Sequence, residues 1–198
     1  MKKILTFVLF AADLFAADLQ KLSKECELGS KKACINFFYE SNDLAKNAEF
    51  AHKLCKNGHF LGCDMLANLY NYGLGVEKDA QKALEFYKKS CDGGEDEGCL
   101  GLGAMQMALK DENGAKTLQK LLSSDDLRVK TFANFALFGA DEKNLANAKA
   151  LCQSEQYADG CLILAMFYDK AAEYEKSAPL YKKACDKGVK QACGLIKK

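Results

Sequence analysis

Apolar side chains recur at helical spacing along most of this chain, and the pattern is clearest between Gly62 and Cys99. Two groups of apolar residues each mark one face of a helix. The first group is Leu66, Ala67, Leu69 and Tyr70, and the second is Ala83, Leu84, Phe86 and Tyr87. Between them, residues 72–79 hold two glycines and end on Asp79, which is typical of a helix end followed by a new N-cap. The stretch therefore predicts a helix, a short turn and a second helix.

Paired cysteines repeat this unit along the chain. Four pairs are separated by eight positions and one by nine: Cys26/Cys34, Cys55/Cys63, Cys91/Cys99, Cys152/Cys161 and Cys185/Cys193. The first cysteines of successive pairs are 29, 36, 61 and 33 residues apart. The gap of 61 residues holds one more copy, because residues 132–139 align with residues 66–73. We therefore predict an all-α solenoid of about six helical hairpins.

The hairpins give the expected domain organisation of a single repeat domain. Their boundaries are predicted at about residues 18–41, 42–78, 79–112, 113–143, 144–173 and 174–198. The fourth hairpin has no cysteine and is expected to open first. Pro179 lies inside the sequence expected to form the first helix of the sixth hairpin. That helix should therefore either begin near Ser177, which is able to cap it, or be kinked at Pro179.

Residues 1–16 have the features of a signal peptide. Lys2 and Lys3 precede an apolar run over residues 4–12, and residues 14–16 offer a cleavage site. Asp13 interrupts the run well before the roughly 20 apolar residues that a membrane-spanning helix needs. Without these residues the formal net charge of +1 falls to zero, so neither nucleic acid nor a membrane is an expected partner of residues 17–198. The sequence predicts a periplasmic or secreted protein.

Ten cysteines in an exported chain of this size predict disulfides. In each pair the first cysteine should end one helix and the second should begin the next, which places the two Cα atoms within the range of roughly 4.4 to 6.8 Å that a disulfide needs. Zinc binding is the alternative, through His52, Cys55, His59 and Cys63. It is disfavoured because three other pairs have the same spacing and no histidine nearby. No metal or cofactor is predicted.

Motifs of known hydrolases are missing from the sequence. No serine is followed by a lysine at the third position, and Lys116-Thr117 is followed by Leu118 rather than glycine. There is no G-x-S-x-G or H-E-x-x-H element either. Neighbouring carboxylates such as Asp125 and Asp126 are expected to cap helices and face solvent. The residues alone therefore assign no catalytic group.

Aromatic residues outside the repeat register are candidates for a binding surface. They are Phe37, Phe38, Tyr39, Phe60, Tyr72 and Tyr157. Packing in the core or at the end of the solenoid is at least as strongly expected for each of them. Aromatics at fixed repeat positions, such as Phe50 and Phe86, are expected in the core.

Residues 66–94 resemble the Sel1-like repeat, a relative of the tetratricopeptide repeat. The matching positions are Leu66-Ala67, Tyr70, Gly73, Gly75-Val76, Asp79, Ala83, Phe86-Tyr87 and Gly94. Together with the cysteine pairs and the N-terminal segment, residues 18–198 resemble the cysteine-rich protein family of Helicobacter type, also called the hcp beta-lactamase family. The resemblance implies an exported, disulfide-linked solenoid that binds penicillin and slowly hydrolyses beta-lactams. The fourth hairpin departs from this pattern, and no catalytic residue is carried over.

Two interpretations of function follow. The enzyme interpretation rests on the family resemblance alone, and its ligand is a beta-lactam. The alternative rests on architecture, because stacked hairpins form a concave groove that suits a protein, a peptide or a cell-wall fragment. A disulfide-linked scaffold without catalytic activity is therefore the second expectation.

Overall fold

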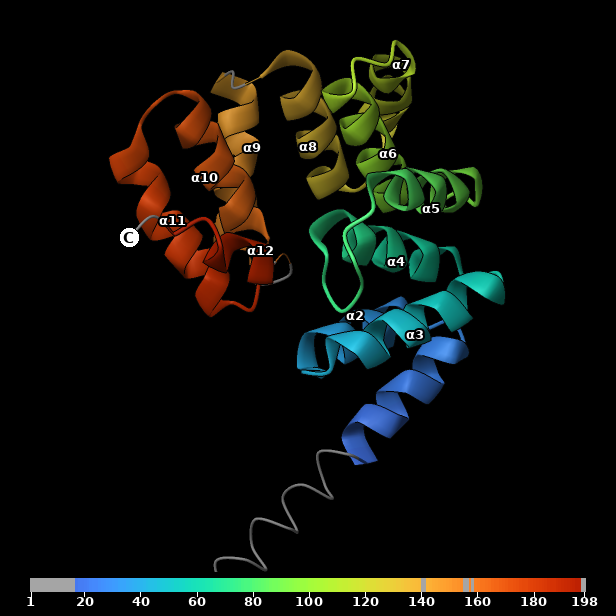
Figure 1. Cartoon of the computed structure of the whole chain (residues 1–198). Coiled ribbons are helices and arrows are strands. Elements are labelled where there is room, and N and C mark those ends of the chain that lie inside the picture. The colour runs from blue at the N-terminus through green and yellow to red at the C-terminus, as the bar shows by residue number, and fades with distance from the viewer. Residues whose placement is uncertain (1–16, 140–141, 155–156, 158, 197–198) are drawn as a thin grey trace, which may run out of the picture. The chain divides into compact units, whose positions relative to one another are not determined.

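The computed structural model describes residues 17–139, 142–154, 157 and 159–196, so the predicted signal peptide at residues 1–16 lies outside the described residues. The described chain contains helices and no strand, which confirms the predicted all-α fold (Figure 1). Residues 17–27 are helical. The later helices are α2 (Lys31–Glu40), α3 (Leu44–Lys56), α4 (Phe60–Tyr72), α5 (Ala80–Asp92), α6 (Asp96–Ala108), α7 (Asn113–Lys120), the 3-10 helix η1 (Leu121–Ser123), α8 (Leu127–Phe138), α9 (Glu142–Gln153), α10 (Gly160–Lys170), α11 (Tyr174–Asp186) and α12 (Lys190–Cys193). None of these helices is long and apolar enough to cross a membrane.

The chain forms two compact units, which divide between Glu95 and Asp96. In the N-terminal unit, α4 packs against both α3 and α5. Two apolar clusters fill this unit, and Phe38 and Met65 contact both of them. The described hairpins of this unit therefore share a core, as expected of a solenoid.

In the C-terminal unit, α6 packs on α7, and α10 packs on both α9 and α11. Glycines bring α6 and α7 unusually close together. A Cβ added to Gly103 would lie 2.6 Å from Leu118 Cγ, and one added to Gly114 would lie 2.7 Å from the Met107 nitrogen. Any larger side chain at either position would push the two helices apart.

The turn between α4 and α5 forms as its sequence predicts. Gly73 ends α4 with a positive φ of 69°, a conformation that costs glycine little. Gly75 also has a positive φ, and a Cβ there would lie 2.1 Å from the Leu44 oxygen. The Asp79 carboxylate accepts hydrogen bonds from the Gln81 and Lys82 backbone nitrogens, each at 3.0 Å, and so caps α5.

Two buried tyrosines occupy the same place in two hairpins, four residues before the first cysteine of a pair. The Tyr87 hydroxyl donates to Asn68 Oδ1 over 3.0 Å, and the Tyr181 hydroxyl donates to Asp169 Oδ2 over 2.7 Å. Burial raises the pKa of both phenols above the ordinary value. Each tyrosine is therefore a neutral donor that joins the first helix of a hairpin to the helix before it.

Of the two alternatives for the sixth hairpin, a helix that begins near Ser177 is wrong. Helix α11 begins at Tyr174, three residues before Ser177, and Pro179 lies inside it. Ser177 does not cap the helix, because its hydroxyl donates to the Tyr174 carbonyl oxygen over 3.2 Å. The residues before Pro179 remain helical because Ser177 is buried and its backbone nitrogen donates to the Glu173 oxygen. Packing therefore outweighs the cost of an interior proline.

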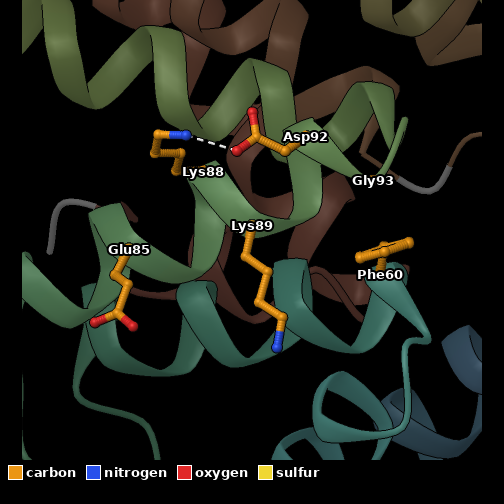
Figure 2. Close-up of a pocket in the computed structure, with 6 residues that line it drawn as sticks. All are labelled: Phe60, Glu85, Lys88, Lys89, Asp92 and Gly93. Carbon is orange, nitrogen blue, oxygen red and sulfur yellow. Dashed lines mark hydrogen bonds and ion pairs between the residues drawn. The ribbon is translucent and has the colours of Figure 1, made fainter.

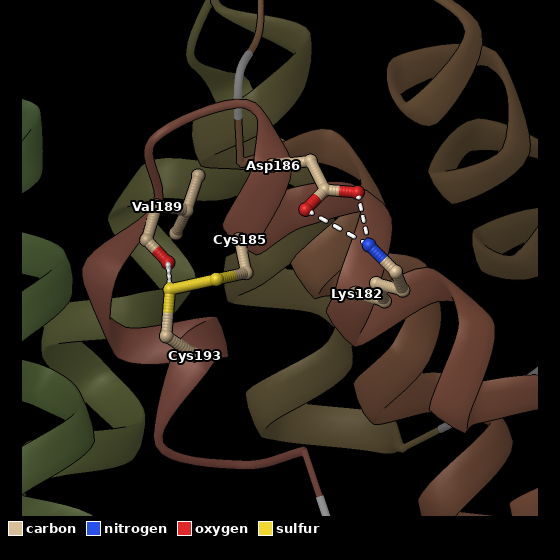
Figure 3. The surroundings of a disulfide bond; sticks show 5 residues. All are labelled: Lys182, Cys185, Asp186, Val189 and Cys193. Carbon is tan, nitrogen blue, oxygen red and sulfur yellow. Dashed lines mark hydrogen bonds and ion pairs between the residues drawn. A yellow bond between two sulfur atoms is a disulfide. The ribbon is translucent and has the colours of Figure 1, made fainter.

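Disulfides close the hairpins, which confirms the predicted disulfide-linked fold. Four bridges join Cys26 to Cys34, Cys55 to Cys63, Cys152 to Cys161 and Cys185 to Cys193, the last shown in Figure 3. Their Cα atoms are 4.6, 4.5, 4.1 and 4.8 Å apart in that order, so the bridge with nine-residue spacing falls just below the expected range. Cys91 and Cys99 are also disulfide-bonded, and no cysteine is free. Each such loop restricts the unfolded chain by about 2.5 kcal/mol in the loop-entropy estimate.

The disulfide at Cys55 and Cys63 also decides against the zinc alternative at this place. Both sulfur atoms of the proposed ligand set are bonded to each other, so neither is a thiolate. His52 is exposed on α3, and His59 precedes α4 without a side-chain cap hydrogen bond. Among the described residues, no group of three or more side chains is arranged to hold a metal ion.

Candidate functional site

A pocket of 620 Å³ lies on the first hairpins of the N-terminal unit. Four segments line it: the helix of residues 17–27, the end of α2, the link at residues 41–43 and one side of α3. We call it the N-terminal pocket. Its size falls within the range of about 300 to 1,000 Å³ that is typical of small-molecule sites.

Two phenylalanines and Leu19 form the apolar part of the N-terminal pocket. The ring centroids of Phe37 and Phe50 are 4.6 Å apart, with 54° between the ring planes. Phe38 contacts both rings from the core side, at 5.6 and 6.2 Å. Phe37 is one of the aromatics outside the repeat register that the sequence marks as a binding candidate, whereas Phe38 packs into the core.

Five charged side chains line the same pocket, and four of them form two ion pairs. Lys46 Nζ lies 3.1 Å from Asp43 Oδ2, and Lys53 Nζ lies 2.6 Å from Glu27 Oε1. The fifth is Glu49, which forms no hydrogen bond or ion pair with any described residue. The pocket therefore has one carboxylate without a compensating charge.

The Asp43 carboxylate also starts α3. It accepts a hydrogen bond from the Lys46 backbone nitrogen over 3.1 Å, and this bond holds the pKa of Asp43 below its ordinary value. Asp43 is therefore ionised at neutral pH, and its negative charge balances the positive charge of Lys46 beside it. Because Lys46 is paired with Asp43 and Lys53 with Glu27, Glu49 is the pocket carboxylate that is available to a ligand.

Two side chains in or behind the pocket wall donate hydrogen bonds to backbone carbonyl groups. The Ser23 hydroxyl donates to the Gln20 carbonyl oxygen over 2.9 Å, so its proton is directed to a carbonyl rather than to a base. The Ser41 carbonyl accepts a hydrogen bond from Asn47 Nδ2 over 3.5 Å. Asn47 itself is buried, and its Oδ1 has no donor. The Ser23 hydroxyl is therefore not activated as a nucleophile, and the Asn47 bond fixes the link between α2 and α3.

A second, smaller pocket of 370 Å³ lies at the end of α5 (Figure 2). The Phe60 ring occupies the space beside Gly93, where an added Cβ would lie 2.1 Å from Phe60 Cγ. Figure 2 shows Lys88 paired with Asp92, and Glu85 apart from them. The Lys88 Nζ and Asp92 Oδ2 atoms are 2.6 Å apart. We call this the α5 pocket. It has one aromatic ring instead of two, and its walls are charged.

The remaining aromatic candidates divide between surface and core. Tyr39 and Tyr72 are 45% and 51% exposed and line neither of the two pockets. Tyr157 packs against the core of the C-terminal unit. Sequence reasoning did not predict the role of Glu49. Its place four residues before Lys53 indicates an ion pair within the helix, whereas Lys53 is paired with the distant Glu27.

The Sel1 repeat family matches the chain at residues 61–95 and 159–189. The first match covers α4 from its second residue and all of α5, and the second contains α10 and α11. The first includes every position on which the sequence resemblance was based. The comparison with curated proteins found no match.

Among solved structures, the chain is similar to c5321, described as a protective antigen present in uropathogenic Escherichia coli strains displaying an SLR fold. The two share 20% sequence identity with a TM-score of 0.48, over 90% of this chain and 43% of that chain. This chain therefore spans less than half the length of that protein.

The matched repeats begin one helix later than the disulfide-closed hairpins do. Each matched repeat begins with the second helix of a disulfide hairpin, so Cys55 lies before the first match and Cys63 lies inside it. In the same way, Cys185 lies inside the second match and Cys193 follows it. The bridges thus connect each matched repeat to the chain beside it. The protein is an all-helical, disulfide-linked chain that contains two matches to the Sel1 repeat.

Proposed function

We propose that this protein is a binding scaffold and that its N-terminal pocket receives a side chain of a short peptide segment. The observation that carries the proposal is the Phe37–Phe50 pair, which offers an aromatic surface inside a pocket of 620 Å³. Aromatic surfaces with a few placed polar groups are typical of ligand sites, and helical repeats commonly bind extended partners. The charged residues around the rings would then select among peptides.

Binding of the oxidised protein to an array of random decapeptides tests this proposal. Selected peptides should lose most of their binding to the Phe37→Ala variant, because half of the aromatic surface is removed. The matched control is Tyr39→Ala, which removes an exposed aromatic side chain from the same helix outside the pocket. Thermal melting of each variant shows that the fold is kept.

Three results would contradict the proposal. One is an array without any binding peptide, and another is equal loss in the two variants. The third is binding to purified cell-wall fragments but to no peptide, which would identify a different class of ligand.

The resemblance to the hcp beta-lactamase family supports a second proposal, penicillin binding with slow beta-lactam hydrolysis. The Sel1 match and the eight-residue cysteine spacing support it. Ser23 is not set up as its nucleophile, because its hydroxyl donates to a backbone carbonyl. The test is turnover of a chromogenic beta-lactam by the oxidised protein, with a reduced and unfolded preparation as control. Turnover that does not exceed the control would remove this proposal.

A periplasmic or secreted location belongs with either proposal. All ten cysteines are in disulfides, and such bonds persist in oxidising compartments and are rare in the cytosol. Fractionation of the native host, followed by blotting for the protein, tests the location. Recovery in the cytosolic fraction with free thiols would contradict it.

A further inference from the structure

We infer that the N-terminal pocket selects arginine, so that the peptide it binds presents an arginine side chain to Glu49 and to the two phenylalanine rings. This inference rests on the proposed peptide-binding function and names the side chain that the pocket recognises. Its basis is the position of Glu49 among the charges of α3.

Glu49 has two lysines at helical spacing, and neither neutralises it. Lys46 lies three residues before it and Lys53 four residues after it, positions from which a lysine commonly pairs with a glutamate. Lys46 is instead paired with Asp43, and Lys53 is paired with Glu27 at the end of the helix of residues 17–27. The carboxylate beside the rings is therefore left for a cation from outside the chain.

Arginine fits this arrangement better than lysine. Its guanidinium is planar and weakly hydrated, it stacks on aromatic faces, and it binds a carboxylate through two parallel hydrogen bonds. Glu49, Phe37 and Phe50 line the same pocket, so we expect one guanidinium bound there to reach both the carboxylate and a ring. A lysine ammonium would find the same charge but would form only a point contact.

Three fluorescein-labelled octapeptides test the inference by anisotropy. They consist of glycine and serine with one leucine, and they differ at one position that holds arginine, lysine or citrulline. Citrulline keeps the shape of arginine and lacks its charge. The arginine peptide should bind about five- to tenfold more tightly than the citrulline peptide. Glu49→Gln should abolish that difference while leaving the citrulline peptide unaffected.

The matched control is Glu85→Gln. Glu85 lies six residues before Cys91 as Glu49 lies six before Cys55, and it is also exposed and unpaired among the described residues, but it lines the α5 pocket. Its substitution should leave the preference for arginine unchanged.

Equal affinity for arginine and citrulline, with both lost in Phe37→Ala, would overturn the inference and leave the proposed function standing. Equal loss in Glu49→Gln and Glu85→Gln would also overturn it. If none of the three peptides binds and the array also yields no binder, both the arginine inference and the proposed peptide-binding function are contradicted.

Discussion

Arg128 Nη1 lies 3.3 Å from Asp159 Oδ2, and this contact crosses 31 positions of sequence in the C-terminal unit. The same guanidinium lies 2.7 Å from Glu97 Oε1. Arg128 is the single arginine of the chain and sits at the start of α8, in the hairpin that has no cysteine. It therefore joins the start of α8 to the start of α6 and to the residue before α10. These contacts hold in place the one hairpin that has no disulfide.

Replacing Arg128 with methionine should reduce the free energy of unfolding by about 2 kcal/mol, because two half-buried carboxylates lose their partner. This is less than for a fully buried pair, since the three side chains are 18%, 27% and 25% exposed. Urea unfolding measures the change. Lys88→Met is the control, because Lys88 and Asp92 form an exposed pair that should contribute under about 0.5 kcal/mol. Similar changes in the two variants would show that Arg128 is an ordinary surface charge.

Removing a single disulfide should have a different effect in each of the two units. Replacing Cys26 and Cys34 by alanine should weaken peptide binding, because Cys26 lies between the pocket residues Ser23 and Glu27. The same change at Cys185 and Cys193 should reduce stability by about 2.5 kcal/mol and leave binding intact. Anisotropy and thermal melting together check both results. Loss of binding in the second variant would argue against a site confined to the N-terminal unit.

Tyr87→Phe should cost about 1 kcal/mol of stability, because the partly buried Asn68 Oδ1 loses the donor that the buried Tyr87 provides. Tyr72→Phe should be nearly neutral, since Tyr72 is 51% exposed. Burial raises the pKa of Tyr87, so its stabilisation is complete below pH 10, the ordinary tyrosine pKa, and is lost as the pH rises above it. Urea unfolding between pH 8 and 11, as rough limits, should show a smaller loss in Tyr87→Phe than in the unmodified protein.

Acid should release the caps of α3 and α5. Hydrogen bonds from the backbone hold the pKa of Asp43 and of Asp79 below the ordinary value of 3.8. Their stabilisation is therefore present above that value and is lost as the pH falls through the lowered pKa. Asp79→Asn keeps a capping oxygen without a titrating group, so this variant should lose less stability between pH 5 and pH 2, as rough limits. An unchanged acid dependence would contradict the role of this cap.

Local signals in the sequence were sufficient for most of the fold. Cysteine spacing predicted the disulfide hairpins, and Gly73 with Asp79 predicted the turn between α4 and α5. These features depend on residues that are close together in the chain, where helical period and capping chemistry decide the structure. The sequence places the sixth hairpin from residue 174, but the alternative helix start near Ser177 was wrong because tertiary packing outweighs the local preference of Pro179.

The candidate site was predicted only in part. Phe37 and Phe60 were marked as aromatics outside the repeat register, and each lines a pocket. The part of Glu49 depends on Lys53 pairing with Glu27, which lies 26 positions away in the chain. The partners of Arg128 are likewise distant in sequence. Such pairings follow from the stacking of helices, and no local pattern encodes them.

Mapping of ¹H–¹⁵N chemical shifts tests the central claim most directly. The oxidised, isotopically labelled protein would be titrated with the arginine octapeptide. The account predicts shifts concentrated at Leu19, Phe37, Glu49 and Phe50, with little change in α10 and α11. Shifts concentrated in the C-terminal unit, or spread evenly over the chain, would contradict a peptide site in the N-terminal pocket.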